Sequence, residues 1–218
     1  MKGVGMNKGT AGRKENGIMP QGLPRTAALA AAALMLSGAL SGCVSFGKDP
    51  PEALLTLTSD AAAPAGTSAS GTVAEALTVM EPDAPQMLDV ARVPVQVNES
   101  TVAYLKDAVW VEKPARLFGR LLAETIRAKQ TRLVIDGPDV RYAAATRLSG
   151  QLLAMGYDAP SQSVVVRFDA VLQQPDGAIR TRRFEAEVNG VLPEAREVAP
   201  ALNEAANKVA AQVAEWVG

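Results

Sequence analysis

The chain contains no histidine, and Cys43 is the only cysteine among its 218 residues. These absences exclude Ser-His-Asp and Cys-His catalysis, zinc sites built on His or Cys, and any disulfide within the chain. Aromatic residues make up only 4% of the sequence, and the formal net charge is −1. Because the sequence has no basic cluster interleaved with aromatics, we expect no nucleic-acid binding.

The N-terminal part of the chain has the pattern of a secretory leader. Five basic residues precede or flank an apolar run from Thr26 to Leu40, which is too short for an ordinary membrane span. The run ends in Leu40-Ser41-Gly42-Cys43, which resembles the lipobox of bacterial lipoproteins. The resemblance implies transfer of a lipid to the Cys43 sulfur, cleavage between Gly42 and Cys43, and acylation of the new amino group. We therefore predict a signal peptide over 1–42 and a lipidated N-terminus and tether over 43–53. Met19 is an alternative start to Met1.

The mature chain is acidic, so the lipid rather than surface charge must hold it to a membrane. Without the leader it keeps 17 basic and 22 acidic residues, a net charge of −5, which anionic lipid headgroups do not attract. A lipoprotein carries more than one acyl chain, and two chains anchor stably. Val44 follows the cysteine, whereas the inner-membrane retention signal of lipoproteins is Asp at that position. We therefore expect an outer-membrane location facing the periplasm.

The residues 54–218 have the pattern of one folded domain whose first half is rich in strands. Ser59–Thr72 is rich in Ala, Ser, Gly, Pro and Thr, which predicts a flexible loop. Pro94 predicts an edge or a bulge in its strand. A small hairpin is expected around Lys106-Asp107, with arms 102–105 and 108–111. The other expected strands are Leu54–Thr58, Val73–Met80 and Met87–Val97.

The second half combines two helices with a long hairpin. Pro114–Lys129 and Glu197–Val217 each place apolar residues on one helical face, and we expect Trp216 to anchor the last helix. A turn at Gln174–Gly177 joins the hairpin arms 164–173 and 179–188. Thr131–Ile135 and Arg147–Met155 are further expected strands. The predicted fold is α/β (α+β): a single sandwich of one mixed, mostly antiparallel sheet with two amphipathic helices on one face.

Several of these features together resemble the ABC-type transport auxiliary lipoproteins. The lipidated cysteine is followed by Thr56-Leu57, a Val-rich strand with Val93-Pro94, Trp110, and a helix ending near Ala128. The sequence departs from the family pattern at 96–98, where Gln-Val-Asn replaces a Tyr-Leu or similar pair. The resemblance implies a non-enzymatic partner of the cell-entry-domain subunit of an ABC transporter. Such systems carry lipids between the inner and outer membranes. It implies no cofactor and allows a homo-oligomer.

Two other functions fit parts of the sequence. The first is an outer-membrane assembly lipoprotein that partners a β-barrel, as in lipopolysaccharide export. The second is an enzyme using a carboxylate pair, either Glu185 with Glu187 or Asp136 with Asp139. No partner that would activate these pairs is visible, so a solvated surface is the favoured interpretation. The remaining candidates for a ligand site are better explained as core or surface residues. They are Tyr104, Trp110, Arg141 and Tyr142. The chain also lacks a G-x-x-x-x-G-K-[ST] nucleotide loop.

The first prediction concerns the anchor. Replacing Cys43 by Ser removes the thiol that would accept the lipid. The variant should therefore leave the membrane fraction in a carbonate wash, while the wild-type chain stays and bands with the outer membrane in a density gradient. Retention of the Cys43→Ser variant would show that another segment holds the chain. Recovery of the wild type with the inner membrane would contradict the expected sorting.

Overall fold

The structure is a computed structural model that describes residues 53–129, 133–135 and 144–218. The predicted signal peptide, both candidate start residues, the Gly42–Cys43 cleavage site and most of the tether lie outside the described residues. Asp136, Asp139, Arg141 and Tyr142 lie outside them too. Among the described helices, none is long and apolar enough to cross a membrane.

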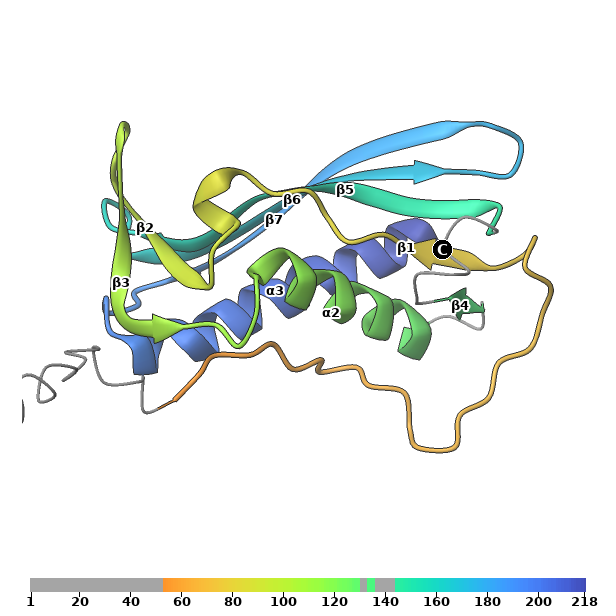
Figure 1. Cartoon of the computed structure of the whole chain (residues 1–218), viewed down its shortest axis with the longest axis horizontal. Coiled ribbons are helices and arrows are strands. Elements are labelled where there is room, and N and C mark those ends of the chain that lie inside the picture. Colours follow the sequence, from red (N-terminus) through yellow and green to blue (C-terminus); the bar gives the residue numbers. More distant parts are fainter. Residues whose placement is uncertain (1–52, 130–132, 136–143) are drawn as a thin grey trace, which may run out of the picture. The chain divides into compact units, whose positions relative to one another are not determined.

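One seven-stranded mixed sheet and two helices form the folded unit (Figure 1). The elements in chain order are β1 (Leu77–Val79), η2 (Gln86–Leu88), β2 (Arg92–Asn98), β3 (Thr101–Val109), α2 (Pro114–Lys129), β4 (Val134–Ile135), β5 (Thr146–Asp158), β6 (Ser163–Gln173), β7 (Ile179–Asn189) and α3 (Ala195–Val217).

Strand β5 organises the sheet because both of its edges are used along its length. On one side it pairs antiparallel with β6, which pairs antiparallel with β7. On the other side its first residues pair in parallel with β1 and its last residues pair in parallel with β2. The short strand β4 extends the sheet beyond β1, and β3 extends it beyond β2. The longest pairings are antiparallel, as predicted.

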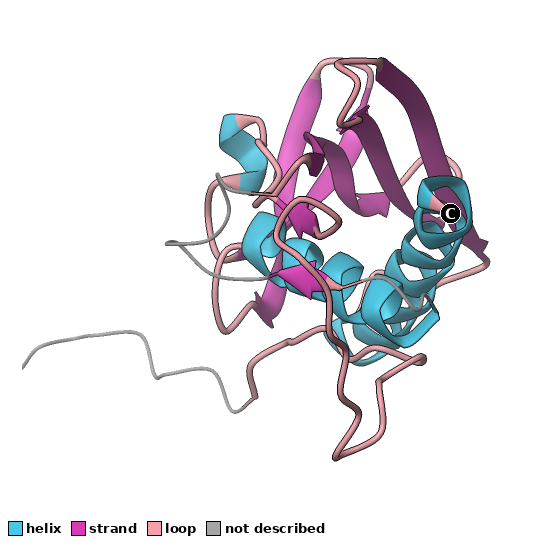
Figure 2. Cartoon of the chain, turned by 90° about the vertical axis from the view of Figure 1, so that its right-hand side faces the viewer, coloured by secondary structure: helices cyan, strands magenta, loops and turns pink. Residues whose placement is uncertain are grey.

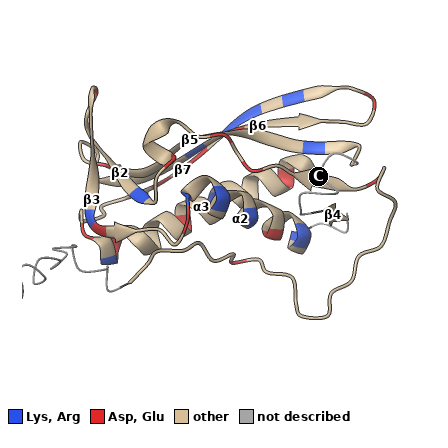
Figure 3. Cartoon of the chain, viewed as in Figure 1, with Lys and Arg blue, Asp and Glu red and all other residues tan. Residues whose placement is uncertain are grey.

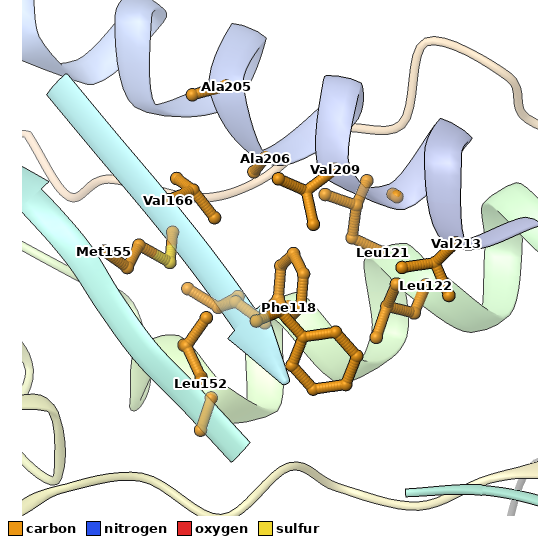
Figure 4. Close-up of a cluster of buried hydrophobic side chains, with 14 of the residues drawn as sticks. Phe118, Leu121, Leu122, Leu152, Met155, Val166, Ala205, Ala206, Val209 and Val213 are labelled. Atoms are coloured by element: carbon orange, nitrogen blue, oxygen red, sulfur yellow. The ribbon is translucent and has the colours of Figure 1, made fainter. Parts of the chain in front are cut away.

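Both helices cover the same face of the sheet, which confirms the predicted sandwich (Figure 2). Phe118 of α2 is fully buried and meets Phe168 of β6 edge to face, with ring centroids 5.3 Å apart. The face of α3 is built largely from alanines, which let its backbone approach α2 and the sheet closely. Figure 4 shows how the side chains of both helices meet those of β5 and β6. The buried alanines of α3 are Ala201, Ala205, Ala206, Ala210 and Ala214.

The two helices and the long hairpin match the sequence prediction. Helix α2 spans Pro114–Lys129 as expected, and α3 begins two residues earlier than expected. The arms β6 and β7 flank the turn at Gln174–Gly177, where Gly177 adopts a positive φ of 85°. Strong periodicity and a turn whose residues suit its geometry explain this agreement.

The predicted hairpin around Lys106-Asp107 is wrong. Strand β3 runs through this pair without reversing, and Asp107 takes a left-handed φ of 57°. The register with β2 passes from Arg92↔Val109 to Pro94↔Tyr104, so β3 carries the extra residues of a bulge. A register shift thus lies next to Pro94, although the extra residues are in β3 and not in the strand of Pro94 as predicted. The chain reverses instead after Asn98, whose side-chain oxygen accepts hydrogen bonds from the Ser100 backbone and hydroxyl, a favoured Asx turn.

Other strand boundaries also differ from the prediction: the strand expected over Arg147–Met155 is longer, as β5, and β4 covers only the end of Thr131–Ile135. Met87–Val97 is divided into the single turn η2 and strand β2, which begins at Arg92. The strand expected over Val73–Met80 is limited to β1. The strand expected over Leu54–Thr58 is reduced to one bridge, between Leu55 and Trp110. Ser59–Thr72 forms neither helix nor strand.

The second prediction compares how much Phe118 and Trp216 contribute to the stability of the fold. Phe118 is fully buried, whereas Trp216 is only partly buried against Phe184 and Arg180. Phe118→Ala should therefore cost about 3–5 kcal/mol of unfolding free energy, and Trp216→Ala should cost less. Chemical denaturation of both variants provides the measurement. An equal or larger loss for Trp216→Ala would restore Trp216 as the main anchor and contradict the described packing.

Candidate interaction surfaces

The carboxylate groups of the described residues form no candidate metal site. No group of three or more Asp, Glu, Cys or His among them could bind a metal ion. Glu185 and Glu187 lie on the exposed face of β7, and Glu185 pairs with Arg167 of the neighbouring strand. This pair therefore belongs to a solvated sheet face, as the sequence suggested. Asp136 and Asp139 lie outside the described residues.

The aromatic candidates are packing residues. Trp110 is 2% exposed and belongs to the core cluster. The Tyr104 hydroxyl donates a 3.4 Å hydrogen bond to the Met87 carbonyl, and the Arg92 guanidinium lies 4.4 Å from the Tyr104 ring centroid. Both aromatics thus secure the β2–β3 end of the sheet.

The segment Leu55–Ala63, here called the strap, crosses the helix layer on the side away from the sheet (Figure 1, orange). It begins at Leu55, whose N–H donates to the Val109 carbonyl at 2.7 Å and whose carbonyl accepts from the Val111 N–H at 2.9 Å. The chain that arrives from the predicted lipid anchor is therefore attached to the folded unit first beside Trp110.

Two asparagines of α3 hold the strap by its backbone. Asn203 accepts a 2.8 Å hydrogen bond from the Thr58 N–H. The Asn207 amide donates to the Thr58 carbonyl at 2.8 Å and accepts from the Asp60 N–H at 2.9 Å. Because Asn203 and Asn207 are four residues apart on α3, their side-chain amides lie next to each other. Together they bind backbone groups of the strap that would otherwise need a neighbouring β-strand.

Helix α2 holds the strap from the other side. The Ser59 and Thr125 hydroxyls are 3.2 Å apart, and Glu124 accepts a 2.9 Å hydrogen bond from the Ala63 N–H. The start of the segment expected to be flexible is therefore bound to both helices. A half-open recess of about 300 Å³ remains between strap and helix. It is lined by Thr56, Leu57, Ser59, Leu117, Arg120, Leu121 and Glu124.

Sequence reasoning missed the strap, although one signal for it was present. Asn207 is only 8% exposed and stands among the alanines of the buried face of α3. An amide in that position needs hydrogen-bond partners because an unsatisfied buried polar group is costly. The partner could not be identified from periodicity, since it comes from a segment almost 150 residues earlier in the chain.

The face of the sheet away from the helices carries paired charges. The Arg183 guanidinium donates two hydrogen bonds to the Asp169 carboxylate of β6, at 2.6 and 2.7 Å. These bonds hold the pKa of Asp169 below its ordinary value and raise the pKa of Arg183, while slight burial acts in the opposite direction on each. In the adjacent ion pair the base, Arg167, is on β6 and the acid, Glu185, is on β7, so the charges are exchanged between the two strands.

A small pocket lies on the same face near the β2–β5 junction. Its volume is about 130 Å³. It forms because Gly156 lets Pro94 approach: a Cβ on Gly156 would stand 2.4 Å from the Pro94 carbonyl oxygen. The lining residues are Met87, Pro94, Gln96, Ala154, Met155, Gly156, Tyr157, Asp158, Val165 and Arg167. The pocket is a mostly apolar recess with the charged residues Asp158 and Arg167 in its lining.

The third prediction tests the strap. Asn207→Ala removes two hydrogen bonds to the strap, so the Asp60 amide, which loses its acceptor, should exchange with solvent at least about tenfold faster, and unfolding free energy should fall by about 1–3 kcal/mol. Hydrogen exchange followed by mass spectrometry measures this. Glu204→Ala, on the exposed side of the same helix, is the matched control. Unchanged exchange in Asn207→Ala would mean that the amide does not hold the strap.

Comparison with known proteins agrees with this geometry. No curated protein matches the chain. A crystal structure of protein XCC0632 from Xanthomonas campestris shares the fold, with a TM-score of 0.59 at 16% identity, and the match covers 75% of this chain and 92% of that one. A crystal structure of an uncharacterized protein matches with a TM-score of 0.58 at 15% identity, over 66% of this chain and 92% of that one. The model of one family matches residues 55–214, from the first residue of the strap almost to the end of α3. The chain therefore belongs to the family of ABC-type transport auxiliary lipoprotein components.

Proposed function

We propose that this chain is a lipid-anchored, non-enzymatic component of an ABC transport system with a cell-entry-domain subunit, and that the system carries lipid between the inner and outer membranes. The observation that carries the proposal is the family match over 55–214, which includes the strap, the sheet and both helices. Among the described residues, no group of three or more Asp, Glu, Cys or His could hold a metal ion, and an auxiliary role requires none.

The proposed anchor is a lipid on Cys43, left at the N-terminus when 1–42 are removed. Leu55, the first residue of the strap, follows Cys43 by 12 residues. Even a fully extended connection then keeps the start of the strap within about 40 Å of the lipid. With Val44 after the cysteine, we propose the outer membrane as the site of attachment and the periplasm as the compartment of the folded unit.

The proposed role is docking, and the packing limits where a partner can bind. The apolar faces of α2 and α3 are buried against the sheet and each other, and the strap crosses their other side. The sheet face away from the helices and the outer strands are left for contacts. The bulge at Lys106-Asp107 is our proposed contact for the transporter subunit, because its side chains are 84% and 67% exposed and it stands close to Trp110 along β3.

The fourth prediction tests this function by binding and by genetics. The mature protein should bind the periplasmic part of the cell-entry-domain subunit, and Lys106→Glu with Asp107→Lys should weaken binding about tenfold or more, since reversed charges at a contact oppose association. Lys208→Glu on α3 is the matched control and should bind normally. Binding can be followed by crosslinking and pull-down from membranes.

Deletion of the gene should weaken the outer-membrane lipid barrier to the same degree as deletion of the transporter, and the double deletion should add nothing. Additive defects would separate the two proteins into different systems. A pull-down that recovers only a β-barrel assembly protein would contradict the proposal and favour an assembly lipoprotein instead.

A further inference from the structure

Strand β7 leaves one complete edge of the sheet open. In the part of the chain that the structure describes, β7 pairs only with β6, and the register is unbroken from Ser163↔Asn189 to Gln173↔Ile179. The 11-residue strand contains no proline and no bulge, two common devices that stop an edge strand from pairing with another chain.

The turn at the tip of the hairpin fixes which backbone groups face this edge. The Gln174 N–H donates to the Ala178 carbonyl at 2.8 Å, so the even-numbered residues of β7 are those bonded to β6. Hydrogen-bonding direction alternates along an antiparallel strand. The odd-numbered residues, such as Thr181, Arg183 and Glu185, therefore direct their N–H and C=O groups toward the open edge.

The charges of β7 are arranged with opposite signs in its two halves. Arg180, Arg182 and Arg183 precede Phe184, and Glu185 and Glu187 follow it. In Figure 3 the basic segments of this strand lie toward the hairpin tip. Such a strand is complementary to itself when reversed: an antiparallel second copy centred on Phe184 places Arg183 opposite Glu185 of that copy, and Glu185 opposite its Arg183.

The charge pairs already present in the sheet extend across this contact. Asp169 lies opposite Arg183, and Arg167 lies opposite Glu185. The row across two joined sheets would then read Asp169 and Arg183 of one copy, followed by Glu185 and Arg167 of the other, alternating in sign throughout. The symmetry-related row is identical. Moving the register by two residues in either direction places Arg183 against Arg183 or Glu185 against Glu185, which is unfavourable.

We propose that two copies of this chain join antiparallel through β7, in the register that places the two Phe184 residues opposite each other, to form one continuous sheet. The two-fold axis stands perpendicular to the sheet. Both helix layers and both straps then lie on the same side, so that both proposed lipid anchors reach one membrane. This contact deepens the proposed function by naming its homo-oligomer interface, and it does not depend on which transporter subunit is the partner.

The test uses two charge variants of the full chain, purified in detergent. Arg183→Glu places two acids opposite each other in a dimer of that variant, and Glu185→Arg places two arginines opposite each other. Each variant alone should associate at least about tenfold more weakly than the wild type. A mixture of the two restores both opposite-charge pairs, so it should form the mixed dimer. Light scattering and co-purification of differently tagged variants measure this.

The control measurements show whether an effect on association comes from the β7 edge or from a loss of folding. Both side chains are well exposed, at 61% for Arg183 and 42% for Glu185, so thermal unfolding of each variant should resemble that of the wild type. Arg116→Glu, an exposed reversal on α2, should associate normally. A monomeric wild type, either variant associating as the wild type does, or a mixture that stays monomeric would overturn the proposal. Failure of transporter binding would leave this result unaffected.

Discussion

The contact between the alanine-rich face of α3 and the aromatic pair Phe118–Phe168 is the constraint on which the other features depend. Small side chains let α3 lie close to both α2 and the sheet, and Phe118 fills the space between them from α2. Because interiors are close-packed, a larger side chain on α3 would move the helix outward. The two asparagines on the same helix would then lose the strap. The positions of both helices and of the strap therefore depend on the packing of α3.

The strap gives the helix layer a second role besides covering the sheet. A lipoprotein of this kind has one attachment to its membrane, and the path of the chain from that attachment decides which side of the body faces a partner. Asn203 and Asn207 bind the strap through its backbone, and Glu124 and Thr125 bind it from α2. Since these contacts are to backbone or to small hydroxyls, the strap can vary in side-chain sequence and still be held. The helix side is thereby occupied, while the outer sheet face and the β7 edge stay open.

The open surfaces also differ in chemistry from the closed ones. The outer sheet face carries ion pairs between neighbouring strands, which contribute little to folding because they are exposed. Fixed alternating charges can instead favour one partner and one register. The hydrogen bonds from Arg183 lower the pKa of Asp169 and raise the pKa of Arg183, so each partner favours the charged form of the other. An auxiliary transport component can act through such surfaces, and here they lie on the side that the strap leaves free.

The sequence by itself determined the elements whose signals are local. Helical periodicity defined α2 to the residue and α3 to within two residues, and alternation with a Pro-Asp-Gly turn defined the β6–β7 hairpin. The resemblance carried by Thr56-Leu57, Val93-Pro94 and Trp110 indicated the family that the comparison shows. The tertiary structure alone decided the rest. Asp107 lies in a bulged strand and not in a turn because the chain on both sides of it pairs with β2, and Leu55–Ala63 is held by helix side chains far away in the sequence. Likewise, no local pattern predicts that β1 and β2 both pair with the same edge of β5. Strands that are far apart in the sequence pair according to the packing of the whole sheet.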